Sequence, residues 1–264
     1  MRSVKKGGAG AARRASRHVS DIEQAVDVLI GADEAARRSR RYLADHDAPS
    51  DDHIAYARLC LVVFAQGLGF NAVDAKLQAL NEAFVGFAPD RVATFDDAQI
   101  ARVLEAPIIR NEAKVRACVE NARRWVEASD GATYLGKIAA IAAGDDAADG
   151  WPALVDRLQA DFARIGETAA RQTLKRWGFF TAFAHPGSRR VLERLHLVDE
   201  SDPPAAVQCF VGAVARIAGR DPYQLEASLA LFASLGPCKR DPACDACVIA
   251  DRCPTGLGRA SASA

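Results

Sequence analysis

Long hydrophobic runs are missing from this 264-residue chain. A membrane-spanning helix needs about 18 or more apolar residues in succession, and no stretch reaches that length. The N-terminus carries charges but lacks the apolar core of a secretory signal peptide. We therefore expect a cytoplasmic protein that does not act at a membrane.

Strand patterns are also absent, because apolar and polar residues hardly ever alternate in this sequence. Apolar residues recur at helical spacing instead, which indicates an all-α fold. Asp96 and Asp97 place acidic residues at the start of one predicted helix, and Pro152 suits the first turn of another. The predicted helices cover about residues 21–45, 53–66, 71–84, 96–105, 112–128, 133–143, 151–163, 167–177, 188–195, 204–218 and 222–234.

Net charge is lacking too, since 34 Lys and Arg residues balance 34 Asp and Glu residues. Taken alone, this balance argues against a nucleic-acid-binding protein. The charge is uneven, however, because residues 1–20 contain six Lys and Arg residues and no acid. Such an arm is either a disordered tail or an electrostatic tether to phosphates.

Cysteine is scarce outside one cluster, which excludes a chain-wide disulfide framework. The cluster has the spacing C-x5-C-x2-C-x5-C within sixteen residues, as expected of metal ligands. Zinc sites usually use two close pairs of ligands, whereas here one close pair is flanked by a lone cysteine on each side. The spacing therefore favours a [4Fe–4S] cluster, with zinc as the alternative. The four ligands are Cys238, Cys244, Cys247 and Cys253, and the remaining cysteines are Cys60, Cys118 and Cys209.

The chain length fits one large domain or two lobes in close contact. Residues 144–150, with the sequence GDDAADG, form the clearest internal linker. We therefore expect a basic disordered arm over 1–20, an N-terminal helical part over 21–145, a second helical part over 146–235, a cluster loop over 236–255 and a disordered tail over 256–264.

A short connection joins the predicted helices 151–163 and 167–177. It includes Arg164 and Gly166, and Gly166 is expected to adopt the positive φ that the turn needs. The N–H groups that open the next helix would then point outward and could seat a phosphate. Any two helices need a turn, so this signal becomes informative only together with the cysteine cluster.

A helix, a hairpin, a second helix and then a four-cysteine loop resemble the helix-hairpin-helix superfamily of DNA glycosylases. Its endonuclease III and adenine-mismatch branches end in a [4Fe–4S] loop, usually spaced C-x6-C-x2-C-x5-C. Other stretches are similar to bacterial 3-methyladenine DNA glycosylase I, including FAQGLGF at 64–70, FVGFAPDRVA at 84–93, IIRNEAKV at 108–115 and LKRWGF at 174–179. The resemblance implies a two-lobed all-α fold with a C-terminal cluster loop.

Two catalytic residues of the superfamily are missing from this chain. Bifunctional members carry a lysine just after the hairpin, where this chain has Thr168, so we expect no lyase activity. The family's catalytic aspartate aligns with His185, or with Gly187 in a gapped match. His185 is the first candidate for a replacement, because a neutral imidazole can orient or deprotonate water. Glu167 is the second, although a charge at a helix N-terminus also explains it, and Asp199 with Glu200 is a further possibility.

The resemblance also suggests which residues contact DNA. Gln66 and Phe70 follow a helix where related enzymes fill the gap left by an extruded base or line its pocket. The hairpin residues Arg164, Gly166 and Thr168 would contact the DNA backbone, as would Lys239 and Arg240 beside the cysteines. Val62 stands where the 3-methyladenine enzymes have a pocket glutamate.

The expected activity is that of a monomeric, monofunctional DNA glycosylase, associated with the nucleoid if the cell is bacterial. It would bind double-stranded DNA containing damaged bases and hydrolyse the N-glycosidic bond of a flipped base. An alkylated purine such as 3-methyladenine is the expected substrate, because its positive charge lets the base leave as a neutral molecule. The alternatives are a non-catalytic damaged-DNA-binding protein and an endonuclease III-like lyase acting on oxidised pyrimidines.

Overall fold

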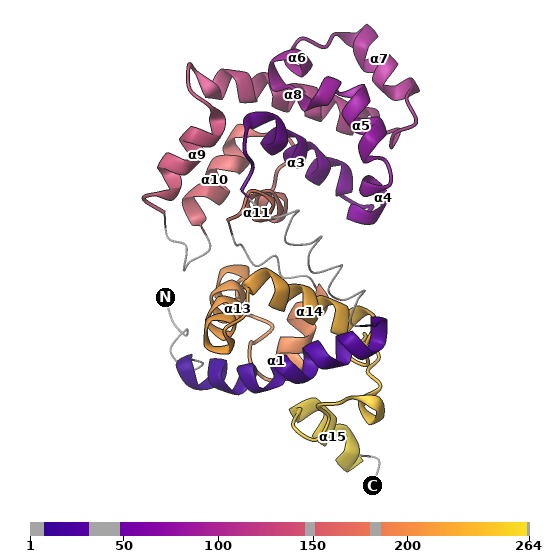
Figure 1. Ribbon diagram of the computed structural model, residues 1–264, viewed down its shortest axis with the longest axis vertical. Coiled ribbons are helices and arrows are strands. Elements are labelled where there is room, and N and C mark those ends of the chain that lie inside the picture. The colour runs from indigo at the N-terminus through magenta and orange to yellow at the C-terminus, as the bar shows by residue number, and fades with distance from the viewer. Residues whose placement is uncertain (1–7, 32–47, 146–150, 180–185, 263–264) are drawn as a thin grey trace. The chain divides into compact units, whose positions relative to one another are not determined.

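The computed structural model describes residues 8–31, 48–145, 151–179 and 186–262. Every regular element in these ranges is a helix, which confirms the all-α expectation (Figure 1). None of the described helices is long and apolar enough to cross a bilayer. The described residues form two compact units, which we call the hairpin unit (48–145 and 151–179) and the loop unit (8–31 and 186–262).

The hairpin unit is built around one central helix, α3. Nine of the residues of α3 are buried, on all of its faces, because its sequence is apolar almost all round. Helices α8 and α11 are among those that pack against it. The elements are α3 (Asp52–Ala65), α4 (Phe70–Asp74), α5 (Leu77–Ala83), the 3-10 turn η2 (Val85–Phe87), α6 (Pro89–Ala93), α7 (Asp97–Glu105), α8 (Glu112–Ser129), α9 (Tyr134–Ala142), α10 (Pro152–Asp161) and α11 (Glu167–Arg176).

Aromatic side chains fill the core of this unit. The Trp125 ring lies 4.5 Å from the Tyr134 ring and 5.7 Å from each of Tyr56 and Trp177, measured between centroids. All four side chains are at most 1% exposed. Their burial is the expected result for large apolar rings at helical spacing.

Local capping residues explain several helix boundaries. Asp96 forms a capping box with Gln99 at the start of α7, and Pro152 lies in the first turn of α10. The predicted helix 71–84 is split into α4 and α5, however. Lys76 leaves the helical conformation, with φ −116° and ψ 6°, and its N–H bonds to Val73 three residues back. This tighter turn closes α4 before α5 begins.

The loop unit joins the N-terminal helix to the last third of the chain. Helix α1 packs against α13 and α14, and α12 packs against α14. A short turn, η3, and a final helix, α15, belong to the cysteine segment (Figure 1). The bounds are α1 (Gly8–Ile30), α12 (Pro186–Arg194), α13 (Pro204–Ala218), α14 (Pro222–Ser234), η3 (Cys244–Ala246) and α15 (Pro254–Ala262).

Two segments expected to be disordered are helical instead. Residues 8–20 of the basic arm belong to α1, where Ala12, Ala15 and Val19 are at most 4% exposed. Small apolar residues at helical spacing form a buried stripe along this arm. The prediction of disorder relied on the many basic residues and overlooked this stripe. Residues 256–262 of the expected tail belong to α15. Residues 1–7 and 263–264 lie outside the described ranges.

The spatial units also differ from the expected linear segments. The hairpin segment 151–179 packs with the helices of the N-terminal half, whereas residues 8–31 pack with the C-terminal helices. The linker 146–150 and residues 32–45 of the first predicted helix lie outside the described residues.

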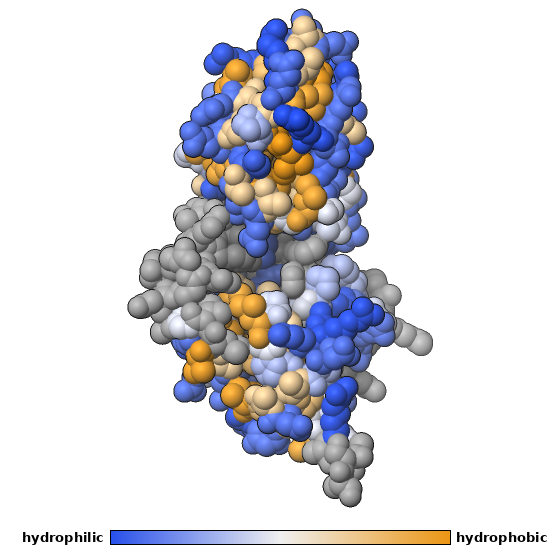
Figure 2. Space-filling model, turned by 90° about the vertical axis from the view of Figure 1, so that its right-hand side faces the viewer, coloured by the Kyte–Doolittle hydropathy of each residue, from blue (hydrophilic) through white to orange (hydrophobic). Residues whose placement is uncertain are grey.

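Large apolar side chains are exposed at only a few described positions. The face drawn in Figure 2 is mostly hydrophilic, with hydrophobic residues gathered in patches. Two of the exposed residues, Leu68 and Val248, are each 53% exposed and lie in segments that the sequence marks as functional. Exposed apolar residues in such segments are candidates for contact with a partner molecule.

Candidate functional site

The hairpin between α10 and α11 is anchored by two buried side chains, Phe162 and Ile165. Between them, Arg164 adopts a positive φ of 60°. The expectation that Gly166 supplies the positive φ is therefore wrong. Gly166 is extended, with φ −80° and ψ 177°, because it serves as the N-cap of α11.

The outer side of the hairpin is open. Arg164, Gly166, Glu167 and Thr168 are all exposed, and no side chain caps the N-terminus of α11. A Cβ atom at Gly166 would meet no other atom within 4 Å. The first N–H groups of α11 are thus accessible to an anion, and the DNA contacts assigned to Arg164, Gly166 and Thr168 stay predictions.

A buried asparagine holds the hairpin from inside. Ala163 N–H donates to Asn121 Oδ1 at 2.7 Å, and Asn121 Nδ2 donates to the Ala163 carbonyl at 3.1 Å. Asn121 is 0% exposed. Its role was not foreseen, although an asparagine at a position surrounded by apolar residues on α8 is a usable signal, since a buried amide needs partners.

The end of α3 is joined to the same hairpin. Gln66 Nε2 donates to the Arg164 carbonyl at 2.8 Å. The ammonium group of Lys114 donates to the carbonyls of Phe64 and Gln66 at 2.8 and 2.6 Å, which caps the C-terminus of α3. Burial, together with the nearby Arg164 charge, lowers the pKa of Lys114 below its ordinary value.

Beyond Gln66, the chain forms a tight loop that carries an exposed leucine. Leu68 lies between Gly67 and Gly69, whose φ values are 77° and 79°. Because Gln66, two positions before it, bonds to the Arg164 carbonyl, Leu68 lies in the same region as the hairpin. Leu68 was not among the predicted DNA contacts, although a leucine between two glycines, two positions after the predicted gap-filling residue Gln66, is a readable signal.

Phe70, the second predicted pocket residue, begins α4 and is half-buried. The guanidinium carbon of Arg176 lies 3.8 Å from the centre of the Phe70 ring. One face of the ring is thus engaged by a cation–π contact. Val62, where the resemblance places a glutamate, is fully buried in α3 and brings no carboxylate to this region.

Of the candidate catalytic acids, Glu167 belongs to the hairpin unit, and Asp199 and Glu200 belong to the loop unit. Glu167 is exposed and pairs with Arg171 one turn along α11 at 3.1 Å. Asp199 and Glu200 lie in an exposed turn whose carbonyls accept hydrogen bonds from Arg189. His185 lies outside the described residues, so its assignment stays a prediction.

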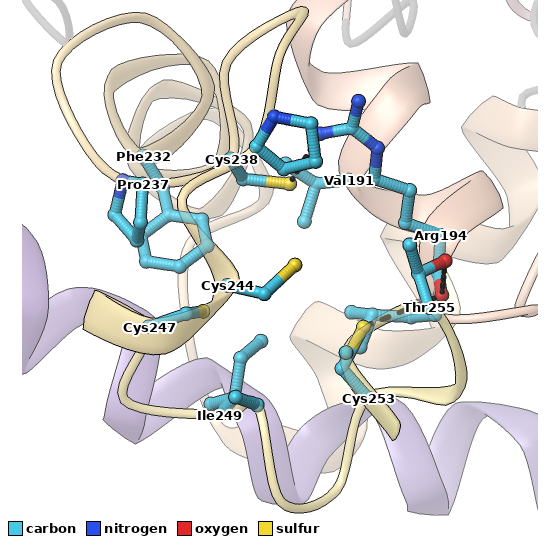
Figure 3. A pocket seen from close by; sticks show the side chains of 14 residues that line it. Val191, Arg194, Phe232, Pro237, Cys238, Cys244, Cys247, Ile249, Cys253 and Thr255 are labelled. Atoms are coloured by element: carbon cyan, nitrogen blue, oxygen red, sulfur yellow. Dashed lines mark hydrogen bonds between the residues drawn. The ribbon is translucent and has the colours of Figure 1, made fainter. Parts of the chain in front are cut away.

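The four clustered cysteines line one cavity in the loop unit. Figure 3 shows their side chains around this cavity, with Cys238 and Cys253 on opposite sides. The empty space is about 360 Å³, part of it open to solvent. Apolar residues such as Val191, Phe232 and Ile249 complete its lining.

The protonation of these thiols depends on their burial. Burial raises the pKa of Cys238 above its ordinary value, and a hydrogen bond from Arg194 opposes this effect. Burial also raises the pKa of Cys247, with further contributions from the charges of Cys238, Cys253 and Cys244. Metal ligation by these cysteines would therefore release protons. Among the described side chains, no three of His, Cys, Asp or Glu form a metal-ion site, so the cluster and its zinc alternative stay predictions.

The cysteine loop is attached to neighbouring elements at several points. Arg252 forms an ion pair with Asp21 of α1 at 2.9 Å. A Cβ atom at Gly256 would meet the carbonyl oxygen of Ala250 at 2.7 Å, so only glycine lets α15 approach the loop this closely. The side chains of Lys239 and Arg240 are exposed, as expected of residues that contact DNA phosphates, but their role stays a prediction.

Comparison with known proteins gives similarities for about half of the chain. No curated protein matches the sequence. A crystal structure of 3-methyladenine DNA glycosylase I is 23% identical, with a TM-score of 0.45, over 51% of this chain and 82% of that chain. A structure of this enzyme from Staphylococcus aureus, determined to explain its recognition of 3-methyladenine, is 21% identical, with a TM-score of 0.45, over 52% and 82%. A solution structure is 18% identical, with a TM-score of 0.47, over 59% and 91%. In sequence, residues 36–152 of this chain match the methyladenine glycosylase family.

Proposed function

We propose that this protein is a DNA glycosylase of base-excision repair that acts on alkylated bases. The observation that carries the proposal is the match of residues 36–152 to the methyladenine glycosylase family. The described part of this match lies in the hairpin unit, and it includes α3, α8 and the loop after α3. The proposed activity is hydrolysis of the N-glycosidic bond of a damaged base.

The hairpin and the loop after α3 would bind the DNA. The uncapped N–H groups of α11 suit a backbone phosphate, and Arg164 adds a positive charge beside them. Gln66 and Leu68 are close to this turn through the Gln66–Arg164 hydrogen bond. In a complex, the apolar Leu68 side chain would enter the base stack while the Gln66 amide contacts the orphaned base.

The proposed substrate is an alkylated purine such as 3-methyladenine. Its base already carries positive charge, so the glycosidic bond breaks with a neutral leaving group. Extraction of the base and tight binding could then supply most of the rate enhancement, which suits a chain that has His185 or Gly187 in place of the superfamily's catalytic aspartate. Thr168 in the place of the lyase lysine supports a monofunctional reaction. We assign water activation to His185, with Glu167 as the second candidate.

We also propose that the cysteine loop holds a [4Fe–4S] cluster. Four cysteine side chains around one largely apolar cavity are a suitable donor set, since thiolates are the protein ligands of such clusters. When bound, the cluster would supply structural cross-linking and a one-electron redox centre. Lys239 and Arg240 would then be held beside it as phosphate contacts. Zinc in the same four thiolates is the alternative.

A base-release assay on methylated duplex DNA tests the enzymatic proposal. We expect free 3-methyladenine by mass spectrometry, and strand breaks only after alkali has cleaved the abasic sites. Breaks without alkali would instead identify a lyase. Tight binding of the lesion with no released base would identify the damaged-DNA-binding protein, an alternative favoured by Thr168 in place of the family's lysine and His185 in place of its aspartate.

Single substitutions separate binding from chemistry in the same assay. His185→Ala should lower turnover and leave DNA affinity unchanged. Leu68→Ala should weaken binding to the damaged duplex, because the apolar wedge is lost. Leu77→Ala removes a leucine of the same unit that is 43% exposed and lies in α5, and it serves as the matched control. Unchanged turnover in His185→Ala would remove this residue from the mechanism.

A further inference from the structure

Arg194, at the end of α12, contacts the cysteine loop with both its side chain and its backbone. Its guanidinium Nη1 donates to Cys238 Sγ at 3.4 Å and to the Lys239 carbonyl at 2.6 Å. Its Nη2 donates to the Arg240 carbonyl at 2.8 Å. Figure 3 shows the guanidinium beside the sulfur of Cys238.

The backbone carbonyl of Arg194 reaches the other end of the loop. It accepts a hydrogen bond from the Thr255 hydroxyl at 3.1 Å and one from the Cys253 thiol at 3.4 Å. A single residue therefore bonds to both ends of the loop, since Cys238 and Cys253 are fifteen positions apart. Ligation of a cluster would remove the Cys253 thiol proton and this bond, so the Thr255 hydroxyl is the contact that would hold this end to Arg194.

The loop has little regular secondary structure, and its own backbone bonds form short turns, such as Ala243 N–H to the Pro237 carbonyl and Cys253 N–H to the Ala250 carbonyl. Between the end of α14 and the start of α15, the only helical element is the short turn η3. The guanidinium bonds to two successive carbonyls, those of Lys239 and Arg240, with the fixed fork geometry of arginine. This geometry restricts the direction in which the chain leaves Cys238.

The bond to Cys238 has an electronic consequence. A cluster with four thiolate ligands is negatively charged, and reduction makes it more negative. A cationic donor on a ligating sulfur stabilises the reduced form more than the oxidised form, and so raises the reduction potential. Arg190, on the same helix, places a second positive charge near Cys238 but has no hydrogen bond to the loop.

We propose that Arg194 is the positioning residue of the cysteine loop and that its hydrogen bond to Cys238 raises the reduction potential of the bound cluster. This inference rests on the proposed [4Fe–4S] cluster. A lysine or glutamine side chain at this position cannot form the three guanidinium bonds to Cys238, Lys239 and Arg240. Replacing Arg194 should therefore lower cluster retention and change the reduction potential.

The test compares Arg194→Gln with Arg190→Gln in the full-length protein, purified without oxygen. Iron and sulfide content and visible absorbance report cluster retention, and a redox titration followed by electron paramagnetic resonance reports the potential. We expect Arg194→Gln to retain the cluster about 10- to 100-fold less tightly. A tenfold change in the one-electron equilibrium corresponds to about 59 mV, and we expect a decrease of this order in its remaining clusters. Arg190→Gln should keep its iron and shift the potential less.

Two further variants keep the test decisive. Arg194→Lys retains the positive charge but lacks the fork-shaped guanidinium. It replaces Arg194→Gln in the test if circular dichroism shows that Arg194→Gln does not fold. Gly256→Ala moves α15 away from the loop but leaves the Arg194 side chain intact. It should lose iron, while the clusters that remain keep the wild-type potential.

The outcomes distinguish the inference from the proposal on which it rests. Colourless wild-type protein with stoichiometric zinc, or without metal, would overturn the cluster and the inference together. A wild-type cluster with equal iron content and equal potential in Arg194→Gln would overturn only the inference. Equal potential shifts in Arg194→Gln and Arg190→Gln would also overturn it, since nearby charge would then be sufficient.

Discussion

The hairpin of one unit rests on a closed aromatic core, whereas the cysteine loop of the other rests on a few polar anchors around a cavity. Phe162 and Ile165 bury the hairpin, and Asn121 satisfies its backbone from inside. The loop instead depends on Arg194, on the close approach at Gly256 and on an ion pair to α1. One segment is thus stabilised by packing, and the other surrounds a cavity that the proposed cluster would occupy.

The stability of the two segments should therefore respond differently to substitutions and to removal of a metal. Packing in a closed core contributes several kcal/mol per large side chain, and its loss is felt throughout the unit. The proposed cluster would add to the stability of the loop, whose own backbone bonds form short turns. Substitutions in the hairpin unit should therefore alter stability without altering metal content, and metal removal should affect mainly the loop unit.

Replacing Trp125 should give the largest effect. Trp125→Ala removes a ring that contacts Tyr56, Tyr134 and Trp177, and should lower the free energy of unfolding by about 3–5 kcal/mol in denaturant titrations. Val126→Ala, at a neighbouring position that is 45% exposed, should have little effect. The contrast between units would fail if Trp125→Ala lost the proposed cluster under conditions where it stays folded.

Replacing Asn121 should have the next largest effect. Asn121→Ala leaves the N–H and carbonyl of Ala163 unpaired, which should cost about 1–3 kcal/mol in unfolding free energy. DNA affinity should also fall, because the hairpin loses its internal support. Asn81→Ala, at an exposed position on α5, is the control for both measurements. Equal stability of the two variants would show that the buried amide does not hold the hairpin.

Lys114 should make the free energy of unfolding increase with pH in the alkaline range. Its folded-state pKa lies below the ordinary value of 10.5, so the unfolded chain holds this proton more tightly. The unfolding free energy therefore gains a contribution that grows as pH rises from the lowered pKa towards 10.5. Lys114→Met should remove this gain and cost about 1 kcal/mol at neutral pH through the lost bonds to α3. Lys76→Met, which changes an exposed lysine, should keep the wild-type pH profile.

The ion pair between the loop and α1 should contribute least. Asp21 and Arg252 approach to 2.9 Å, but their side chains are 28% and 45% exposed. Asp21→Asn should lower stability by about 0.2–1 kcal/mol, and added salt should reduce the difference. Asp27→Asn, on the exposed side of α1, is the control. A loss of several kcal/mol on Asp21→Asn would mean that the loop depends on this pair far more than its exposure suggests.

Much of the helical structure was predictable because the causes are local. Asp96 caps its own helix and Pro152 opens the next, so the boundaries near these residues need no distant contact. The spacing of the four cysteines predicted that they share one metal site, and in the structure they line one cavity, while the metal itself stays a prediction. The backbone of the hairpin was not predictable in detail, because the positive φ falls on Arg164 rather than on Gly166.

Helix propensity, capping and ligand spacing act over a few residues, so the amino-acid sequence was sufficient to predict an all-helical chain, the position of its hairpin and the clustering of its cysteines. The packing of α1 with the C-terminal helices, the bonds between Asn121 and Ala163 and the bonds from Arg194 to both ends of the loop were visible only in the folded chain. These contacts join residues far apart in the chain. They depend on which surfaces meet when the helices bury their apolar faces, and no short stretch of sequence contains that information.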